Sequence, residues 1–485
     1  MKINTITRCR MSLAALAMVL GWLLAAPTRA QAQCTSAAGN NAVYGNCGTS
    51  LGVQPSAAYV DASATSTGST EDFCLILYNI IKNLSSGGAV IDARGLSTAN
   101  STMACASNST PWVQSSTVFS KNPATILLPA AQITIANTWI LPQFARIVGE
   151  GPGLTTILAA SGFSAEGAGD TVDAMIEMGT RSSTLSAFCN GNNDCVGVGV
   201  QDVTLNLNGS TAAVLYGIYN ATAEEQSYVD NVVFSNVGSS ASNGTHALEV
   251  TVVSGTPSSS NSGPYSNLIC NVGSAATAQT RCVNLLAHTR GIHGMTCTGN
   301  GTPNAAIYLD SDSDSIEDVY INGFMDGIFV GSQGNAPSNV LFNISGGSTL
   351  TNLIHLCGPS TTGGCTAPST FTCPGGMINV CDLTVLNARS AAGTTIQDDV
   401  TGTALPNSTD SNVGTYILGE QIGSSTTPSQ YSRFTTSPRV PTWGVGNSSP
   451  TSNCAANGSL YSNAAATAAG TILYACVAGT WTNIK

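Results

Sequence analysis

The chain has 485 residues, of which only 8% are Asp, Glu, Lys or Arg, whereas a typical soluble domain carries roughly 25%. Its 15 basic residues are outnumbered by 26 acidic ones, so no basic surface is available to neutralise phosphates and nucleic-acid binding is excluded. A hydrophobic content of 42% with so little charge predicts a packed core rather than disorder.

The N-terminus has the pattern of a secretory signal peptide, which we place at residues 1–32. Lys2, Arg8 and Arg10 precede an apolar run over 11–26, and Ala30-Gln31-Ala32 supplies a small-x-small cleavage site. The run is short for a membrane span, which needs ~20 apolar residues, and no later stretch resembles one. We therefore expect a secreted protein, extracellular or at the cell surface, with no transmembrane segment in the mature chain.

The cysteines predict a disulfide-bonded chain, as expected after export. Removal of Cys9 with the signal leaves an odd number of the 16 cysteines. The spacing predicts the pairs Cys34/Cys47, Cys74/Cys105, Cys189/Cys195, Cys357/Cys365, Cys373/Cys381 and Cys454/Cys476. Cys270, Cys282 and Cys297 then leave one cysteine over, which we expect to be buried as a small hydrophobic residue.

One helix is predicted near the N-terminus. Ser69 and Asp72 resemble a capping box, apolar residues recur at helical spacing from Phe73 to Leu84, and Gly87-Gly88 follows. We expect this helix over 70–84 to cap the N-terminal end of the structure.

After Ala89 the chain consists of short apolar segments separated by turns, and two kinds of segment alternate. The first apolar residues of one kind are Ile218, Leu248, Val283, Ile307, Ile328 and Ile354. The other kind begins after Asn or Asp, at 202–205, 231–234, 267–270, 318–321 and 339–342. A pair of strand types that recurs every 20–35 residues or so indicates a parallel β-solenoid, whose coils bury their apolar faces by stacking. A β-sandwich would also give many short strands but not this ordered recurrence.

The first strands also resemble the opening of the pectate-lyase-like right-handed parallel β-helix superfamily. The resemblance lies in residues 89–95 (AVIDARG), 126–129 (ILLP), 133–135 (ITI), 147–151 (IVGEG) and 156–158 (TIL), and it extends over roughly 70–400. It implies an all-β, right-handed, single-stranded β-helix with an N-terminal capping helix.

We expect five segments along the chain. The signal peptide is followed by a loop-rich segment with the helix and first strand at 33–115 and by the parallel β-helix at 116–405. A Ser/Thr/Pro-rich linker or edge segment follows at 406–450. Residues 451–485 are predicted to form a small disulfide-bridged β-hairpin module with an aromatic face, which acts either in attachment or as a plug.

The resemblance does not extend to the catalytic motifs of the superfamily. The pectin hydrolases carry Asn-Thr-Asp, Asp-Asp, Gly-His-Gly and Arg-Ile-Lys in that order. Here residues 291–294 (GIHG) are one residue too long, and Asp398-Asp399 follows the histidine instead of preceding it. The lyase pattern Arg-x-Pro-x-x-Arg is absent as well, so no catalytic residue is carried over.

Strand periodicity suggests a different candidate site. If the first apolar residues of the recurring strands point inward, their successors point outward and stack into an exposed ladder. The ladder consists of Glu177, Tyr219, Glu249, Asn284, Tyr308, Phe329 and His355. Rings for sugar faces and polar groups for hydroxyls suit a polysaccharide groove, although a solvated strand face would show the same pattern.

Glu177 and Glu249 are the predicted catalytic pair on this ladder. Two rungs of ~4.8 Å place their backbones ~9.6 Å apart, near the ~6.5–9.5 Å carboxyl separation of inverting glycosidases. This geometry requires that no extra coil lies between Glu177 and Ile218.

The densest acidic cluster follows the Tyr308 strand. Asp310 and Asp312 are further candidate acid/base groups, and Asp312, Asp314 and Glu317 are candidate ligands for Ca²⁺, the one cofactor we consider. A solvated turn capped by Ser and Asp side chains is the alternative.

These observations favour a polysaccharide-binding β-helix that hydrolyses its ligand with carboxylates as acid and base. A non-catalytic surface or adhesive β-helix is the second hypothesis, and a Ca²⁺-dependent polysaccharide lyase is the third. A ladder covered by other parts of the chain would favour the second.

Overall fold

We describe a computed structural model of the chain. It describes residues 59–64, 72–84, 88–96, 101–106, 109–115, 118–164, 172–180, 182–189, 195–209, 214–239, 244–251, 262–287, 289–309, 315–330, 340–347, 349–356, 383–390, 394–398, 416–417, 420–422, 443–450, 454, 459–467 and 472–484. The predicted signal peptide and the predicted pairs Cys34/Cys47, Cys357/Cys365 and Cys373/Cys381 lie outside these residues.

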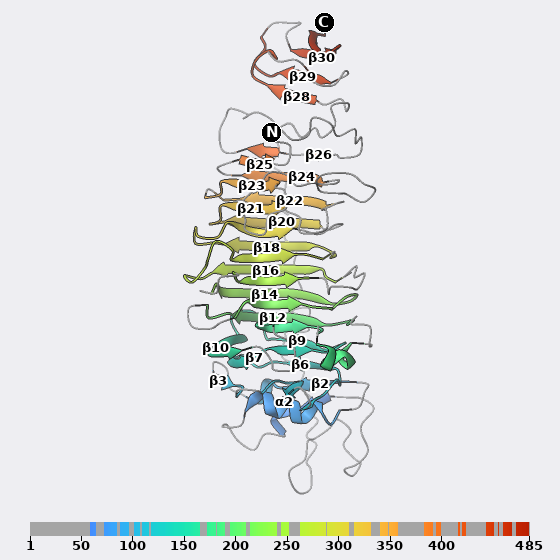
Figure 1. Cartoon of the computed structure of the whole chain (residues 1–485), viewed down its shortest axis with the longest axis vertical. Helices are drawn as coiled ribbons and strands as arrows, with labels where there is room; N and C mark the ends of the chain where they lie inside the picture. Colours follow the sequence, from blue (N-terminus) through green and yellow to red (C-terminus); the bar gives the residue numbers. More distant parts are fainter. Residues whose placement is uncertain are drawn as a thin grey trace, which may run out of the picture.

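Most described strands belong to two long parallel sheets (Figure 1). The larger, 16-stranded sheet contains β1 (Tyr59–Asp61), β2 (Ala89–Asp92), β3 (Ser101–Ala104), β6 (Ala124–Leu127), β7 (Ala131–Asn137), β9 (Arg146–Val148), β10 (Thr156–Ser164), β12 (Gly199–Asn206), β14 (Tyr228–Val237), β16 (Tyr265–Val272), β18 (Ile292–Thr298), β20 (Ser315–Asn322), β22 (Val340–Gly346), β24 (Leu383–Ser390), β26 (Tyr416–Ile417) and β27 (Glu420–Ile422). The nine-stranded sheet contains β8 (Trp139–Leu141), β11 (Ala174–Met178), β13 (Tyr216–Asn220), β15 (His246–Val250), β17 (Arg281–Leu285), β19 (Ala305–Leu309), β21 (Asp326–Val330), β23 (Asn352–Leu356) and β25 (Thr394–Asp398).

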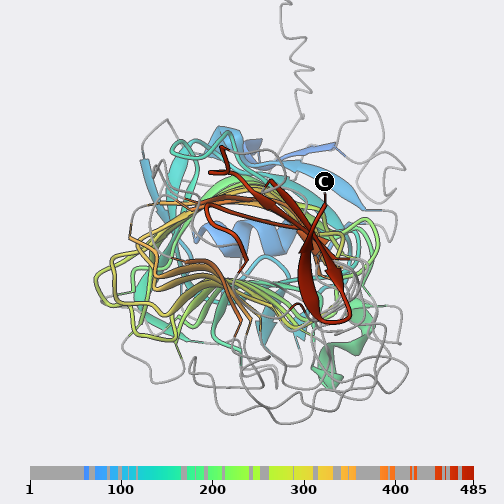
Figure 2. The same cartoon turned by 90° about the horizontal axis from the view of Figure 1, so that it is seen from above.

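From β12 to β25 the chain alternates strictly between the two sheets, and each strand pairs with the strand two positions later. One strand from each sheet therefore makes up one coil, and the coils stack along the long axis (Figures 1 and 2). This architecture is consistent with a parallel β-helix and confirms the predicted alternation of two strand types. The pairing of β11 with β13 also shows that no extra coil lies between Glu177 and Ile218.

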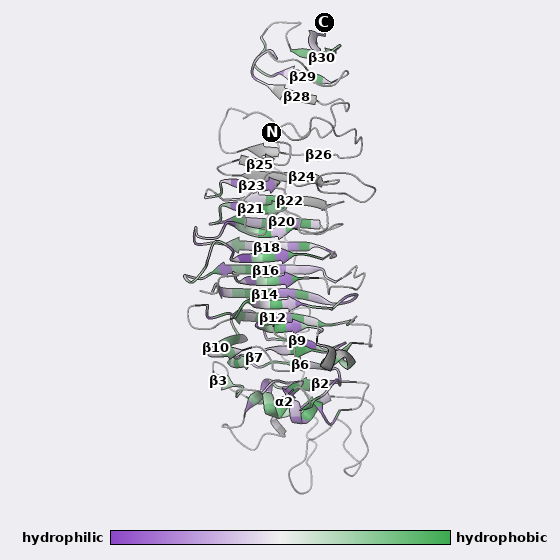
Figure 3. Cartoon of the chain, in the orientation of Figure 1, coloured by the Kyte–Doolittle hydropathy of each residue, from purple (hydrophilic) through white to green (hydrophobic). Residues whose placement is uncertain are grey.

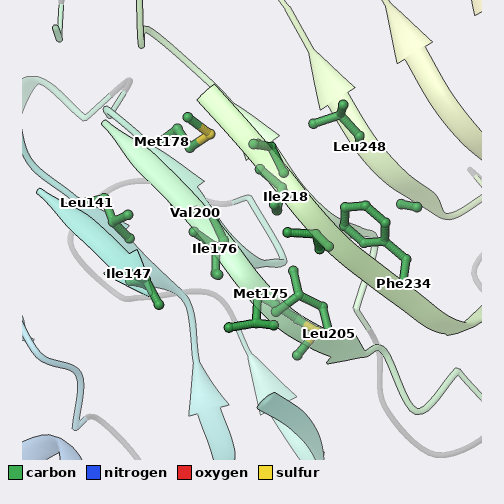
Figure 4. Packing of buried hydrophobic residues seen from close by; sticks show 14 of the residues in the cluster. Leu141, Ile147, Met175, Ile176, Met178, Val200, Leu205, Ile218, Phe234 and Leu248 are labelled. Carbon is green, nitrogen blue, oxygen red and sulfur yellow. The ribbon is translucent and has the colours of Figure 1, made fainter. Parts of the chain in front are cut away.

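The core lies between the two sheets. Ile176, Ile218, Leu248, Val283 and Ile307 are in register on consecutive strands of the nine-stranded sheet, and all are fully buried. They pack against residues of the larger sheet, as Figure 4 shows for Val200, Leu205 and Phe234. Apolar and polar residues intermingle along the strands in Figure 3, as expected when one side of each strand faces this core.

The Asn and Asp residues that precede the second set of strands have a structural explanation. Asp202, Asn231, Asn267 and Asp318 have φ between 51° and 58°, and Gly294 at the equivalent position has φ 71°. Asn, Asp and Gly are the residues that tolerate this left-handed conformation. The stacked turns bend each long strand of the larger sheet at the same place, and Asn231 Nδ2 donates to Asp202 Oδ1 on the preceding coil at 2.6 Å.

The predicted helix is present as α2 (Phe73–Ile81), shorter than the expected 70–84. Asp72 is itself the N-cap, because its carboxylate accepts the backbone N–H groups of Cys74 and Leu75. The apolar face of α2 joins the main core, and Figure 1 places the helix at one end of the stack. The other helical segments among the described residues are 3₁₀ turns at Ala62–Ala64, Arg94–Leu96 and Ser183–Phe188.

The described cysteines confirm three predicted disulfides, Cys74–Cys105, Cys189–Cys195 and Cys454–Cys476. Cys270 pairs with Cys282, and among the described cysteines Cys297 is free and fully buried, as expected for the one left over from this group of three. Burial raises the pKa of the Cys297 thiol far above its ordinary value. Disulfides on this scale indicate an oxidising environment.

Two smaller sheets complete the described structure. The hairpin of β4 (Val113–Ser115) and β5 (Val118–Phe119) lies near the N-terminal end. The C-terminal sheet contains β28 (Trp443–Gly446), β29 (Leu460–Asn463), β30 (Leu473–Val477) and β31 (Thr480–Asn483). Its rings cluster as predicted, with Tyr461 in contact with Tyr474 and Trp481.

The left-handed turn at Asn231 yields the first prediction. Asn231→Ala and Asn231→Gly both remove the hydrogen bond to Asp202, but only alanine is strained at a φ of 51°. We expect urea unfolding to show the alanine variant to be less stable than the glycine variant by about 1–2 kcal/mol. Equal stability of the two variants would contradict this account of the turn.

A polar cluster joins the first two strands of the larger sheet. Arg94 donates to both carboxylate oxygens of Asp92, at 2.8 and 2.7 Å, and the Tyr59 hydroxyl donates to the same carboxylate. The bonds from Arg94, with that from Tyr59, lower the pKa of Asp92 from 3.8 to about 2.

Asp92 therefore predicts a pH-dependent stability. Because its pKa is lower in the folded chain, its contribution is present above about pH 4 and disappears as the pH falls to about 2. Since Arg94 is partly exposed, we expect Asp92→Asn to lower the free energy of unfolding at neutral pH by only about 1 kcal/mol. Urea titrations of both proteins should converge as the pH approaches 2, and a constant difference would refute the assignment.

Candidate functional site

The predicted ladder exists as a register in the nine-stranded sheet. Consecutive strands pair Glu177 with Tyr219, Tyr219 with Glu249, and Glu249 with Asn284. The series continues through Tyr308, Phe329 and His355. We call these seven residues the outer ladder, and their order along the stack is the one expected from the sequence.

The expected exposure of the outer ladder is wrong. Glu177 and Tyr308 are fully buried, and Tyr219, Glu249, Asn284 and Phe329 are exposed to 5% or less. The His355 side chain retains 13% of its exposure. Strand periodicity predicts the side of the sheet on which a side chain lies, but burial also depends on what packs over that side.

A second row of side chains lies beside the outer ladder, three residues earlier in each strand. The inner ladder, as we name it, consists of Ala174, Tyr216, His246, Arg281, Ala305, Asp326 and Asn352. Contacts such as His246 to Glu249 and Arg281 to Asn284 show that residues three apart share one face.

A strict alternation of inward and outward residues does not predict the inner ladder, because the inner ladder requires two consecutive inward residues in each strand. A Cβ on Gly217 would lie 2.8 Å from the buried ring of Phe234, so position 217 faces the core, as does Ile218. A signal was nevertheless present in the sequence, since polar or aromatic residues recur three positions before most members of the outer ladder.

Glu249 lies at the centre of the first polar cluster. Its Oε2 is 2.7 Å from His246 Nδ1 and accepts a hydrogen bond from Asn284 Nδ2, also at 2.7 Å. Asn284 in turn accepts from the Arg281 guanidinium at 2.6 Å. The His246 ring meets Tyr216 edge to face, and Tyr216 contacts Tyr219.

Arg281 connects this cluster to the aromatic part of the outer ladder. Its guanidinium carbon lies 4.1 Å from the centroid of the Tyr308 ring, a cation–π contact. Burial lowers the pKa of Arg281 below its ordinary value, while Tyr308 and Glu249 act in the opposite direction. The Tyr308 and Phe329 rings are stacked, with centroids 5.8 Å apart.

Asp326 forms the second polar cluster, beyond the stacked rings. Its Oδ1 accepts from Asn352 Nδ2, and its Oδ2 is 2.7 Å from His355 Nδ1. His355 also meets Phe329 edge to face, so the chain of contacts continues along the outer face from Tyr219 to His355.

This face collects the buried carboxylate, imidazole and guanidinium groups of the described chain. Among the residues the structure describes, the buried carboxylate, imidazole and guanidinium side chains are Glu177, His246, Glu249, Arg281 and Asp326. All five lie on the nine-stranded sheet, in a chain of which only 8% is charged. Burying charge is costly, and its concentration in one place marks a candidate functional site.

Of the predicted Ca²⁺ ligands, the structure describes only Glu317. Glu317 belongs to β20 of the larger sheet, where it lies opposite His293 on the neighbouring strand β18. Asp310, Asp312 and Asp314 lie outside the described residues. Within the described ranges, the close group of acidic and sulfur ligands is Asp72, Cys74 and Cys105. There the cysteines form a disulfide and the aspartate caps α2, so these residues do not fit a metal site.

Among the described residues, no helix has the length and apolar character needed to cross a membrane.

The two-sided role of Asn284 predicts a large effect of its loss. Asn284→Leu removes one buried hydrogen-bond partner from Glu249 and one from Arg281, and we expect the free energy of unfolding to fall by about 2–4 kcal/mol. The double variant Arg281→Met/Asn284→Leu also removes the guanidinium that has lost its hydrogen-bond acceptor. It should therefore be no less stable than Asn284→Leu alone. Additive losses in urea unfolding would contradict the coupling.

No protein-family model matches the sequence, and no curated protein matches it. Two solved structures of the catalytic domain of a GH87 alpha-1,3-glucanase, in complex with tetrasaccharides or with nigerose, are 12% identical, with 61% of this chain and 64% of that chain covered and a TM-score of 0.26. Geobacillus virus E2 ORF18 is 10% identical, with 75% of this chain and 61% of that chain covered and the same TM-score. The chain thus spans less than two thirds of each of these structures, and likeness at this level assigns neither family nor activity.

Proposed function

We propose that this chain binds a polysaccharide segment along the outer face of the nine-stranded sheet and hydrolyses it there. The observation that carries the proposal is the gathering on this face of the five buried carboxylate, imidazole and guanidinium groups of the described chain. The outer ladder supplies flat rings in Tyr219, Tyr308 and Phe329, which suit the apolar faces of sugar rings. His355 supplies a polar group for hydroxyls, whereas both polar atoms of the Asn284 amide already contact Arg281 and Glu249.

Glu177 and Glu249 are the proposed catalytic pair. They lie two strands apart with Tyr219 between them, so their backbones are separated by ~9.6 Å, which suits an inverting mechanism. One carboxylic acid donates its proton to the glycosidic oxygen as the bond to the anomeric carbon breaks. The other carboxylate takes a proton from the water that forms the new bond to that carbon, and exchange with solvent restores both groups.

The burial of the face constrains this proposal. A sugar reaches Glu249 or Tyr219 only when whatever covers them moves aside, because both are almost fully buried. Their exclusion from water strengthens the electrostatic interactions that a bound ligand would meet.

The same burial favours a second candidate, a non-catalytic surface or adhesive β-helix. In that case the polar contacts from His246 to His355 only hold neighbouring coils together. The chemistry of the buried groups then has no role beyond satisfying one another.

The finer features of the fold belong to the proposal. We propose right-handed winding, an end-capping role for α2, membership of the pectate-lyase-like superfamily, and secretion after removal of residues 1–32. The acidic residues Asp310, Asp312 and Asp314 remain candidates for a Ca²⁺-assisted third activity.

The fourth prediction tests the activity. Purified mature chain is incubated with a panel of plant and microbial polysaccharides, with Ca²⁺ or with EDTA, while reducing ends and the ultraviolet absorbance of unsaturated products are followed. We expect new reducing ends without absorbance, and a loss of at least about a hundredfold in rate in Glu249→Gln, because an acid/base group contributes about 10²–10⁴.

The matched control is Glu150→Gln, the same change at a half-exposed carboxylate outside this face, which should leave the rate unchanged. Absorbance that depends on Ca²⁺ would favour the lyase. Absence of any product, with glycan binding retained on an array, would favour the adhesive β-helix.

A further inference from the structure

We infer that His246 and Asn284 are positioning residues that hold Glu249 as the proton-accepting carboxylate of the site, with Oε1 left for the ligand. This inference rests on the proposed function and adds the roles of individual groups to it. It comes from the hydrogen-bond directions around Glu249, which the chemistry of Arg281 fixes.

Arg281 determines which way the Asn284 amide faces. A guanidinium has only donors, so the Asn284 atom that contacts Arg281 at 2.6 Å is the carbonyl oxygen Oδ1. The other end, Nδ2, therefore faces Glu249 and donates to its Oε2 at 2.7 Å. The orientation of this amide follows from its partners and not from its shape alone.

The same reasoning fixes the direction of the contact with His246. As the proposed base, Glu249 is ionised and is therefore only an acceptor, so in this proposal Nδ1 of His246 carries the hydrogen. The imidazole is held against Glu249 by Tyr216, whose ring centroid lies 5.6 Å away. His246 is only 8% exposed, which restricts the other orientations open to its ring.

Both bonds reach one oxygen of Glu249, and none of the described residues donates to Oε1. Asp326 on the same face provides the contrast, because Asn352 engages its Oδ1 and His355 engages its Oδ2. The two carboxylates thus have the same kinds of partner but differ in one respect. Both oxygens of Asp326 are engaged, whereas only Oε2 of Glu249 is engaged by described residues. Glu249 is equipped to take a proton from a ligand or water, whereas Asp326 is equipped to orient His355.

In the proposed hydrolysis, Glu249 Oε1 takes the proton of the attacking water and Glu177 gives its proton to the leaving oxygen. His246 and Asn284 touch neither the water nor the sugar in this account. They act by fixing the carboxylate plane and by keeping Oε2 engaged, so that the proton goes to Oε1.

The first test needs no substrate. Since the chain has four histidines, ¹⁵N-histidine labelling of the full mature chain gives few imidazole signals, and His246→Gln identifies the one of interest. We expect the Nδ1–H tautomer with a hydrogen-bonded, downfield proton that is lost in Glu249→Gln. The Nε2–H tautomer at neutral pH would overturn the inference, because Nδ1 would then accept a proton from Glu249.

The second test uses the polysaccharide that the wild-type chain cleaves. His246→Gln should lower kcat at least about tenfold, with KM within about twofold and a displaced pH profile, and Asn284→Asp should also lower kcat. His293→Gln is the matched control, a histidine beside Glu317 on the other sheet, and should leave kcat unchanged.

The outcomes distinguish a failure of the positioning role from a failure of the proposed function. Cleavage by wild type with an unchanged kcat and pH profile in His246→Gln would overturn the positioning role and leave the proposed function intact. If the wild type cleaves no polysaccharide, the proposed hydrolysis fails, and the catalytic assignment of Glu249 fails with it whatever the tautomer of His246.

Discussion

Backbone hydrogen bonding in register between neighbouring coils is the constraint on which the rest of this structure depends. Each strand of the nine-stranded sheet pairs with the next at equivalent positions. Residues 20–40 or so apart in sequence therefore stack into columns, in which successive residues lie ~4.8 Å apart. Inward columns must be apolar to fill the space between the sheets. Outward columns are free to carry other chemistry, and the outer and inner ladders use that freedom.

The register makes the polar face an interdependent unit. Glu249 and Asn284 bond across one rung, and Arg281 reaches Tyr308 across the next. Glu249, Arg281 and Asp326 therefore each depend on a partner from another coil, and a buried polar network is stable only when its members are satisfied.

Covalent and conformational features support the register away from the candidate site. The left-handed turns at Asn231 and Asn267 bend successive strands at one place, so the larger sheet folds around the core without losing its pairing. Cys270–Cys282 links a strand of the larger sheet to one of the smaller within the core. Cys74–Cys105 ties α2 to the segment after β3, beside the carboxylate of Asp72.

The sequence by itself determined the alternation of two strand types, the helix near residue 73, several disulfides and the order of the outer ladder. These properties are local or periodic, because apolar spacing, turn residues and cysteine separation act over short stretches of chain. Only the tertiary structure decided that the outer ladder is buried, that His246, Arg281 and Asp326 lie beside it, and that Glu317 belongs to the other sheet. Burial depends on what packs over a face. The position of the inner ladder depends on two consecutive inward residues in each strand, which a two-residue period does not encode.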